Sequence, residues 1–197
     1  MATSRPRDAR GFTLLEVLVA MTIVIVLLAV SALFMPGVLA SAKADSGSSQ
    51  LMSALRTARE QAVTERRNIT ISFVAPNQLE VRRDNLGLNG AGDIIVTGQT
   101  LISTTILEQG MEFQRFAAEV PDTPDGFAPV GNEIEFSGLP PWQFTSEGTL
   151  VSQSGDVTNG TIYLARGNDP LTVRAVTLFG ATALLREWKW NGATWFE

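Results

Sequence analysis

The chain has 197 residues, with 20 acidic and 15 basic side chains and a formal net charge of −5 at pH 7. That length suffices for one domain of ordinary size. There is no cysteine and no histidine, which excludes disulfides, the usual zinc sites, thiol nucleophiles and every catalytic triad built on histidine. The acidic balance disfavours a general nucleic-acid surface, which needs clustered Lys and Arg.

An uncharged apolar run dominates the N-terminal region and covers Val17–Met35, in which only two hydroxyl side chains are polar. A helix over Phe12–Met35 would be roughly 36 Å long at about 1.5 Å rise per residue, enough to cross a bilayer. Arg5, Arg7 and Arg10 precede the run. We therefore expect the short N-terminal tail to stay in the cytoplasm and the rest of the chain to lie on the far side.

Glu16 lies inside this hydrophobic segment, one helical turn from its start. A carboxylate at that depth costs several kcal/mol unless it is paired or reaches the interface, so it indicates a function. If the chain were cut between Gly11 and Phe12, the new α-amine would lie one turn from the Glu16 carboxylate. The amine could pair with Glu16 of its own chain. In an assembly, the amine of a neighbouring chain could do so and fix the axial register.

The sequence Gly11-Phe-Thr-Leu-Leu-Glu16, with the apolar run behind it, resembles the type III signal of type IV pilins and type II secretion pseudopilins. In that family a prepilin peptidase cuts after the glycine and methylates the new N-terminal phenylalanine. The resemblance implies a leader peptide of residues 1–11, cleavage between Gly11 and Phe12, N-methylation of Phe12 and an assembly role for Glu16. It also implies a single-pass protein of the bacterial inner membrane with an extracytoplasmic head, incorporated in a pilus or pseudopilus.

Two ordinary interpretations compete with this one. The first is a secretory signal peptide cleaved near Val38-Leu39-Ala40 or Ala40-Ser41-Ala42. The apolar run exceeds the usual h-region of about 7–15 residues, and an acid near its start is out of place there. The second is a plain membrane anchor in which Glu16 reaches the headgroups. Neither has a use for the complete motif, so we favour the pilin interpretation.

Helical periodicity continues after the apolar run. Pro36-Gly37 interrupts the pattern, and residues 41–50, rich in Ser, Ala and Gly, are weakly helical. An apolar stripe then recurs at intervals of four, three and four at Leu51, Leu55, Ala58 and Ala62. We expect one long helix from Phe12 to about Arg66, bent or weakened between Pro36 and Gly47. The predicted segments are a transmembrane helix over 12–36, an amphipathic half over 37–67 and a β-rich head over 68–197.

From Asn68 onward the hydrophobic period changes to two. Ile69–Val74 alternates, Gln78–Arg83 is its predicted hairpin partner, and residues 86–92 form a predicted glycine-rich loop. Residues 119–131, rich in Pro, Asp and Gly, are expected to be an exposed loop, and Asn191-Gly192 indicates a two-residue hairpin turn. The other candidate strands are Asp93–Thr97, Met111–Phe116, Glu133–Phe136, Thr161–Ala165, Leu171–Phe179 and Leu184–Trp190. The prediction is an α+β protein, with a long N-terminal helix packed on an antiparallel β-sheet head, the pilin fold.

The segment Ser53–Ile71 is similar to the start of the head in one subgroup of that family, which contains general secretion pathway protein H and the FimT-like minor pilins. Gly148–Leu150, Gly160–Leu164 and a late strand ending at Gly180 extend the similarity. The resemblance implies a minor pilin or pseudopilin, a structural subunit that acts at the tip or in priming of a type II secretion pseudopilus or a type IV pilus. Its implied partners are prepilin peptidase, other pilins or pseudopilins, and the inner membrane, with no cofactor, metal or enzymatic activity.

Some FimT-like pilins carry a Gly-Arg-x-Arg signature that takes part in DNA capture. Here Gly180 is followed by Ala181-Thr-Ala-Leu-Leu185, so that property does not carry over. The C-terminal region instead offers aromatic and basic candidates for a contact with a partner subunit or nucleic acid: Arg186, Trp188, Lys189, Trp190 and Trp195. We favour cross-strand tryptophan packing there. A DNA-binding minor pilin, or a secreted or anchored binding domain, stays as the alternative function.

Acidic side chains give no further site. Asp122 and Asp125 are too few to indicate calcium binding, and Glu133 and Glu135 share one side of a strand, as on a solvated face.

Overall fold

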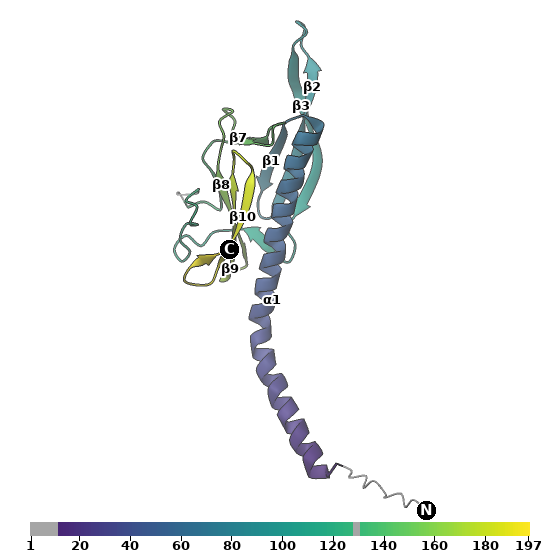
Figure 1. Ribbon diagram of the computed structural model, residues 1–197, viewed down its shortest axis with the longest axis vertical. Coiled ribbons are helices and arrows are strands. Elements are labelled where there is room, and N and C mark those ends of the chain that lie inside the picture. Colours follow the sequence, from purple (N-terminus) through teal and green to yellow (C-terminus); the bar gives the residue numbers. More distant parts are fainter. Residues whose placement is uncertain (1–11, 128–130) are drawn as a thin grey trace, which may run out of the picture. The chain divides into compact units, whose positions relative to one another are not determined.

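The computed structural model describes residues 12–127 and 131–197 (Figure 1). Gly11 and the predicted leader lie outside these described residues. The chain divides into two compact units, Met1–Leu39 and Ala40–Glu197, which are described separately below.

One helix, α1 (Leu14–Glu65), continues through Pro36. It begins and ends within two residues of the predicted limits, and residues 41–50 are helical without a break. Its C-terminal end closes with Arg66 in the left-handed region at φ 52°, and the Arg67 N–H donates to the Ala62 carbonyl oxygen over 3.2 Å. A left-handed residue with a reversed hydrogen bond is a common way to end a helix.

The head contains two antiparallel sheets. The first has the order β3-β2-β1-β6-β7 and the second β11-β10-β9-β8-β4, with β5 also paired to β8. The strands are β1 (Ile69–Val74), β2 (Gln78–Leu88), β3 (Ile94–Ile106), β4 (Met111–Phe113), β5 (Ile134–Phe136), β6 (Trp142–Phe144), β7 (Leu150–Val151), β8 (Gly160–Arg166), β9 (Asp169–Phe179), β10 (Leu184–Trp190) and β11 (Trp195–Phe196). The α+β prediction is confirmed.

The apolar stripe of α1 packs against both sheets. Leu51, Leu55, Ala58 and Ala62 are buried in one core with residues of strands from each sheet. Hydrophobic burial of such a stripe is what holds an amphipathic helix on a sheet. Gly47 allows the helix to approach closely, because a Cβ there would lie 2.6 Å from Cγ of Met111. The sequence prediction had treated this glycine only as a source of weak helicity.

The first hairpin is longer than predicted. β2 extends to Leu88, so the expected glycine-rich loop over 86–92 is wrong and only the turn between Leu88 and Ile94 remains. β3 runs on to Ile106 instead of ending at Thr97. Nearly every residue of β3 is solvent-exposed, so it lacks the alternation of buried and exposed positions on which the prediction depended. β6 and β7 were missed because two or three residues are too short to show a period.

The described part of the predicted loop, residues 119–127, is a loop, and most of its residues are exposed, but two of them are anchored in the head. Val120 and Thr123 are buried, and the Thr123 N–H donates to the Tyr163 hydroxyl over 3.4 Å. Val120 belongs to a second core, on the side of the β8–β9–β10 sheet opposite the helix, with Tyr163, Ala165, Val173, Ala175, Trp188 and Trp190. The segment therefore covers that face of the sheet. Its proline and aspartate content suggested a loop correctly but not its burial.

Candidate functional site: the N-terminal segment and the polar clusters of the head

The N-terminal unit presents an apolar helix surface with one acid near its start. Leu14–Ala32 is long and apolar enough to span a membrane, and none of it is buried against other parts of the chain. The Phe12 side chain is 82% exposed. Phe12 and Glu16 lie on the same side of the helix start, where they line a shallow groove together with Val17 and Ala20. The two residues that the motif singles out are therefore neighbours on one face.

Thr13 caps the start of α1. Its Oγ accepts the Glu16 backbone N–H over 3.2 Å, and its carbonyl oxygen accepts the Val17 N–H over 3.2 Å. Glu16 stands three residues after the cap, so Thr13 and Glu16 have the spacing of a capping box. A carboxylate in the first turn also interacts favourably with the helix dipole. The Thr-x-x-Glu spacing is visible in the sequence, but there Glu16 was interpreted only through its membrane cost, its pairing with an amine and the family motif.

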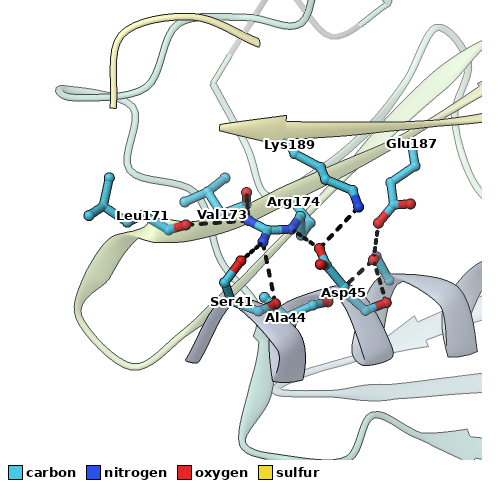
Figure 2. Close-up of polar contacts among 9 residues, drawn as sticks. Ser41, Ala44, Asp45, Leu171, Val173, Arg174, Glu187 and Lys189 are labelled. Carbon is cyan, nitrogen blue, oxygen red and sulfur yellow. Dashed lines mark hydrogen bonds and ion pairs between the residues drawn. The ribbon is translucent and has the colours of Figure 1, made fainter. Parts of the chain in front are cut away.

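A buried arginine joins the head's sheet to the first turns of its helix segment (Figure 2). Arg174 on β9 has a side chain only 3% exposed, and its Nε donates to the Asp45 carboxylate over 2.7 Å. Its Nη2 donates to the Ser41 hydroxyl over 2.8 Å and its Nη1 to the Val173 carbonyl oxygen over 2.9 Å. All these acceptors surround one guanidinium. A buried guanidinium with this many hydrogen-bond acceptors is compensated. Loss of the Asp45 carboxylate would leave the positive charge of Arg174 buried without a counter-charge, which is unfavourable.

β10 contributes two more side chains to this cluster (Figure 2). Lys189 Nζ lies 3.4 Å from the Asp45 carboxylate, and the Ser48 hydroxyl donates to the Glu187 carboxylate. Ser48 is itself buried and also bonds the carbonyl oxygens of Ala44 and Asp45. The stretch rich in small residues thus carries the polar half of the contact between helix and sheet. We call Ser41, Asp45, Ser48, Arg174, Glu187 and Lys189 the helix–sheet polar cluster.

A second polar cluster lies on the opposite face of the same sheet. The Asp125 carboxylate accepts hydrogen bonds from the Thr177 hydroxyl over 2.6 Å and from Trp188 Nε1 over 3.0 Å. Arg186 Nη1 donates to the same carboxylate over 2.7 Å, and its Nε lies 3.2 Å from the Glu197 carboxylate. Asp125 therefore holds the covering segment to β9 and β10. It does not point toward a cation site.

The candidate contact residues of the C-terminal region do not share one surface. Lys189 faces the helix and pairs with Asp45, whereas Arg186 and Trp188 face the other way, toward Asp125. Trp190 pairs with Trp195 across β10 and β11, with ring centroids 5.4 Å apart. The expected cross-strand packing is confirmed.

The turn between β10 and β11 differs from the prediction. Because Trp190 pairs with Trp195, the loop spans the four residues Asn191–Thr194 instead of two. The Asn191 side-chain oxygen accepts hydrogen bonds from two backbone N–H groups of this loop.

Tyr163 stands at the centre of the second core. Burial raises the pKa of its hydroxyl, while the nearby Arg115 guanidinium and the Thr123 N–H act in the opposite direction. The Arg115 guanidinium carbon lies 4.6 Å from the centre of the tyrosine ring, a cation–π geometry, and Arg115 also pairs with Asp122. Among residues 12–127 and 131–197, no group of three acidic, cysteine or histidine side chains is placed to hold a metal ion.

Comparison with known families defines the class of this protein. A prokaryotic N-terminal methylation motif matches residues 6–32, which include the predicted cleavage point, Glu16 and most of the apolar segment. The chain is therefore a membrane-anchored, pilin-like protein.

A second family, described as type II transport protein GspH, matches residues 48–180, about two thirds of the chain. The chain belongs to this family and is a pseudopilin of the type II secretion system. Among solved structures it is similar to the minor pseudopilin EpsH from the type 2 secretion system of Vibrio cholerae. Identity is 14% over 76% of this chain and 96% of that one, with a TM-score of 0.40. No curated protein matches the chain in sequence.

Proposed function

We propose that this pseudopilin is a minor, low-copy subunit that acts near the tip of the type II secretion pseudopilus and primes its assembly. The observation that carries the proposal is the presence of both family segments in one chain, the methylation motif over 6–32 and the GspH region over 48–180. The methylation motif supplies a membrane helix and a processing signal. The GspH region supplies the head, and resemblance to that subgroup implies a minor subunit. The chain acts as a structural subunit, not as an enzyme.

Maturation follows from the motif. Prepilin peptidase cleaves between Gly11 and Phe12 and methylates the new amine of Phe12. Residues 12–36 then hold the protein in the inner membrane, with the precursor's N-terminus in the cytoplasm, because arginines precede the helix. Residues 37–67 connect this anchor to the head over 68–197, outside the cytoplasm. Other pseudopilins are the partners, and they meet the exposed apolar side chains of the first unit.

Glu16 has the assembly role. Its carboxylate is the only charge in the segment Phe12–Met35, and that segment is long enough to lie in the bilayer. When the helix enters a filament, pairing with the amine of a neighbouring Phe12 removes the cost of an unpaired acid and fixes the axial register. Phe12 and Glu16 lie on the same side of the helix start, which makes them available to one neighbour.

Replacement of Glu16 tests this role. We expect Glu16→Val to insert in the membrane and be processed normally, yet to enter pseudopili poorly and reduce secretion. Thr22→Val is the matched control, because Thr22 is also polar and its hydroxyl bonds only the Leu18 carbonyl oxygen of its own helix. Normal incorporation of Glu16→Val into sheared pseudopili would contradict the register role.

The minor-subunit role is tested separately by stoichiometry. Quantitative immunoblotting of purified pseudopili should find this chain at a small fraction of the major subunit, and its deletion should delay or prevent assembly. An amount comparable to the major subunit would overturn the proposal. No observation favours the DNA-binding alternative, since Arg186 pairs with Asp125 and Glu197, and Lys189 pairs with Asp45 on the opposite face.

A further inference from the structure

Three Asn-Gly dipeptides occur in the chain, at Asn89-Gly90, Asn159-Gly160 and Asn191-Gly192. An asparagine followed by glycine can modify itself, because the glycine backbone nitrogen can attack the side-chain carbonyl carbon of the asparagine and close a cyclic imide. Glycine favours this reaction, since it has no Cβ to hinder the attack and its backbone rotates freely. The backbone must be able to close the ring, so the fold decides which of the three sites reacts.

The loop between β10 and β11 leaves the attacking nitrogen free and activates the carbonyl group. Asn191 is exposed, and its side-chain oxygen accepts the Ala193 N–H over 2.9 Å and the Thr194 N–H over 2.8 Å. Two donors on this oxygen polarise the side-chain carbonyl and stabilise the negative charge that develops there during attack. Among residues 12–127 and 131–197, nothing accepts a hydrogen bond from the Gly192 N–H. The loop therefore does not hold this nitrogen back.

The tip of the β2–β3 hairpin has the same arrangement. The Asn89 side-chain oxygen accepts the Ala91 N–H over 2.9 Å and the Asp93 N–H over 2.8 Å. A Cβ built at Gly90 would meet nothing within 4 Å, and in the described chain the Gly90 N–H also lacks an acceptor. Both loops thus combine an activated side-chain carbonyl with a free glycine N–H next to it.

The third dipeptide is held in the sheet. The Asn159 side-chain oxygen accepts the Gly180 N–H over 2.8 Å, so its carbonyl is turned toward another part of the chain. The Asn159 backbone exchanges two hydrogen bonds with Ser137, donating to its hydroxyl over 3.1 Å and accepting its N–H over 2.8 Å. Gly160 is buried and pairs with residues of both β5 and β9. Ring closure would break these contacts, so the fold protects this site.

We propose that Asn89 and Asn191 convert spontaneously into isoaspartate and aspartate in the folded protein, whereas Asn159 stays intact. The glycine nitrogen forms a bond to the asparagine Cγ, the bond from Cγ to Nδ2 breaks, and the glycine N–H proton passes through solvent to the departing ammonia. Water then opens the imide at either of its two carbonyl carbons, which gives aspartate or isoaspartate. This inference goes beyond the proposed function, because the reaction needs only water and no filament, membrane or enzyme.

Each conversion changes its loop. A carboxylate replaces the amide, and isoaspartate also adds one carbon to the backbone. At the hairpin tip, the Asn89 side-chain nitrogen now donates to the Asp93 carboxylate over 2.9 Å. A carboxylate in its place would repel Asp93, so we expect the tip to open. At the other loop, β11 has only two residues and pairs only with β10, so we expect a longer loop to loosen it.

Incubation of the full-length chain in detergent at mildly alkaline pH, followed by tryptic digestion and mass spectrometry, tests the proposal. The three sites fall in separate tryptic peptides, because cleavage occurs after Arg83, Arg115, Arg166 and Lys189. We expect isoaspartate to form at Asn89 and Asn191 at least about tenfold faster than at Asn159, where the fold opposes ring closure. Isoaspartate is the diagnostic product, since direct hydrolysis of the side-chain amide gives only aspartate.

The same incubation in denaturant provides the reference. The three rates should then become similar, because the sites share one dipeptide and differ only in their folded surroundings. Equal rates at Asn159 and Asn191 in the folded chain would overturn the proposal. So would rates at Asn89 and Asn191 no higher than that at Asn132, an exposed asparagine that is followed by glutamate.

Gly90→Ala provides the matched control. The added Cβ meets nothing within 4 Å, so the variant should keep the fold. It should lower the rate at Asn89 at least about tenfold, because the methyl group hinders attack by the backbone nitrogen, and leave the rate at Asn191 unchanged. An unchanged rate at Asn89 in this variant would contradict ring closure as the route. Filament entry and processing are measured separately, so failure here leaves the proposed function intact.

Discussion

Arg174 on β9 donates to the Asp45 carboxylate on α1 over 2.7 Å, and the two residues are far apart in sequence. This pair joins the first turns of the head's helix segment to its second sheet, in a region where α1 carries small side chains. Apart from Ala44, the apolar core residues of α1 begin at Leu51, about two turns after Asp45. The polar contact therefore fixes the end of the helix segment that enters the head first.

Loss of the Asp45 carboxylate should destabilise the head. Asp45→Ala leaves the buried Arg174 guanidinium without its counter-charge, and we expect a loss of about 2–3 kcal/mol in the free energy of unfolding. Ser46→Ala is the matched control, because Ser46 is the exposed neighbour on the same helical turn. Tryptophan fluorescence during denaturant unfolding reports the change, since Trp188 and Trp190 lie in the head's second core. Equal stability of the two variants would show that the pair contributes little.

Gly180 should tolerate no side chain. A Cβ at Gly180 would lie 2.1 Å from the Thr158 carbonyl oxygen and 3.0 Å from that of Leu150, and both are backbone atoms that cannot move aside as a side chain does. We expect Gly180→Ala to cost at least about 3 kcal/mol or to prevent accumulation of the protein. Gly90→Ala, with nothing within 4 Å of its Cβ, should be neutral. Thermal unfolding distinguishes them, and matching midpoints would refute the close approach.

Asp125 should hold the covering segment on the sheet. Asp125→Ala removes the acceptor of Thr177, Arg186 and Trp188, and we expect about 2 kcal/mol of local destabilisation. Limited proteolysis should then cut between Phe116 and Phe127 much faster than in the unaltered chain. Glu119→Ala, an exposed change in the same segment, should leave the cleavage rate unchanged. Unchanged protection in Asp125→Ala would mean that apolar contacts alone hold the segment.

Tyr163 should titrate above the usual tyrosine range. It is the only tyrosine in the chain, so tyrosinate absorbance reports it alone. Burial raises the pKa of Tyr163 in the folded state, whereas the unfolded chain should titrate near about 10. The proton is therefore held more tightly in the folded state. The resulting stabilisation is complete below the unfolded pKa and is lost as the pH rises through the folded one. A folded midpoint at or below that of the guanidinium-unfolded chain would contradict this.

Sequence periodicity predicted the parts of the fold in which buried apolar residues recur at a regular spacing. Leu51, Leu55, Ala58 and Ala62 recur at helical spacing, and Ile69 with Ile71 and Trp188 with Trp190 recur at strand spacing, so each element was placed within a few residues. β3 was cut short because both its faces are exposed and no alternation marks its length. Hydrophobic periodicity arises from alternating burial, so it does not reveal an edge strand whose residues are nearly all exposed.

The polar clusters could not be predicted for a different reason. Arg174 appears in the sequence as one charge within an otherwise apolar and hydroxyl-bearing strand, and Asp45 as one acid in a stretch of small residues. Nothing local links them, because the pairing depends on how α1 lies across β9. The same holds for Asp125, whose three partners come from β9 and β10. The N-terminal motif could be recognised in the sequence because its residues, Gly11 to Glu16, are consecutive.

The mature protein should begin at a methylated Phe12 and keep the apolar helix as its anchor. Intact mass and N-terminal sequencing of the protein from a secreting strain test it most directly, with a strain lacking prepilin peptidase as the control. We expect residues 12–197 plus one methyl group in the first strain and the uncut precursor in the second. A mature chain that keeps residues 1–11, or that begins at Ser41 or Lys43, would contradict it.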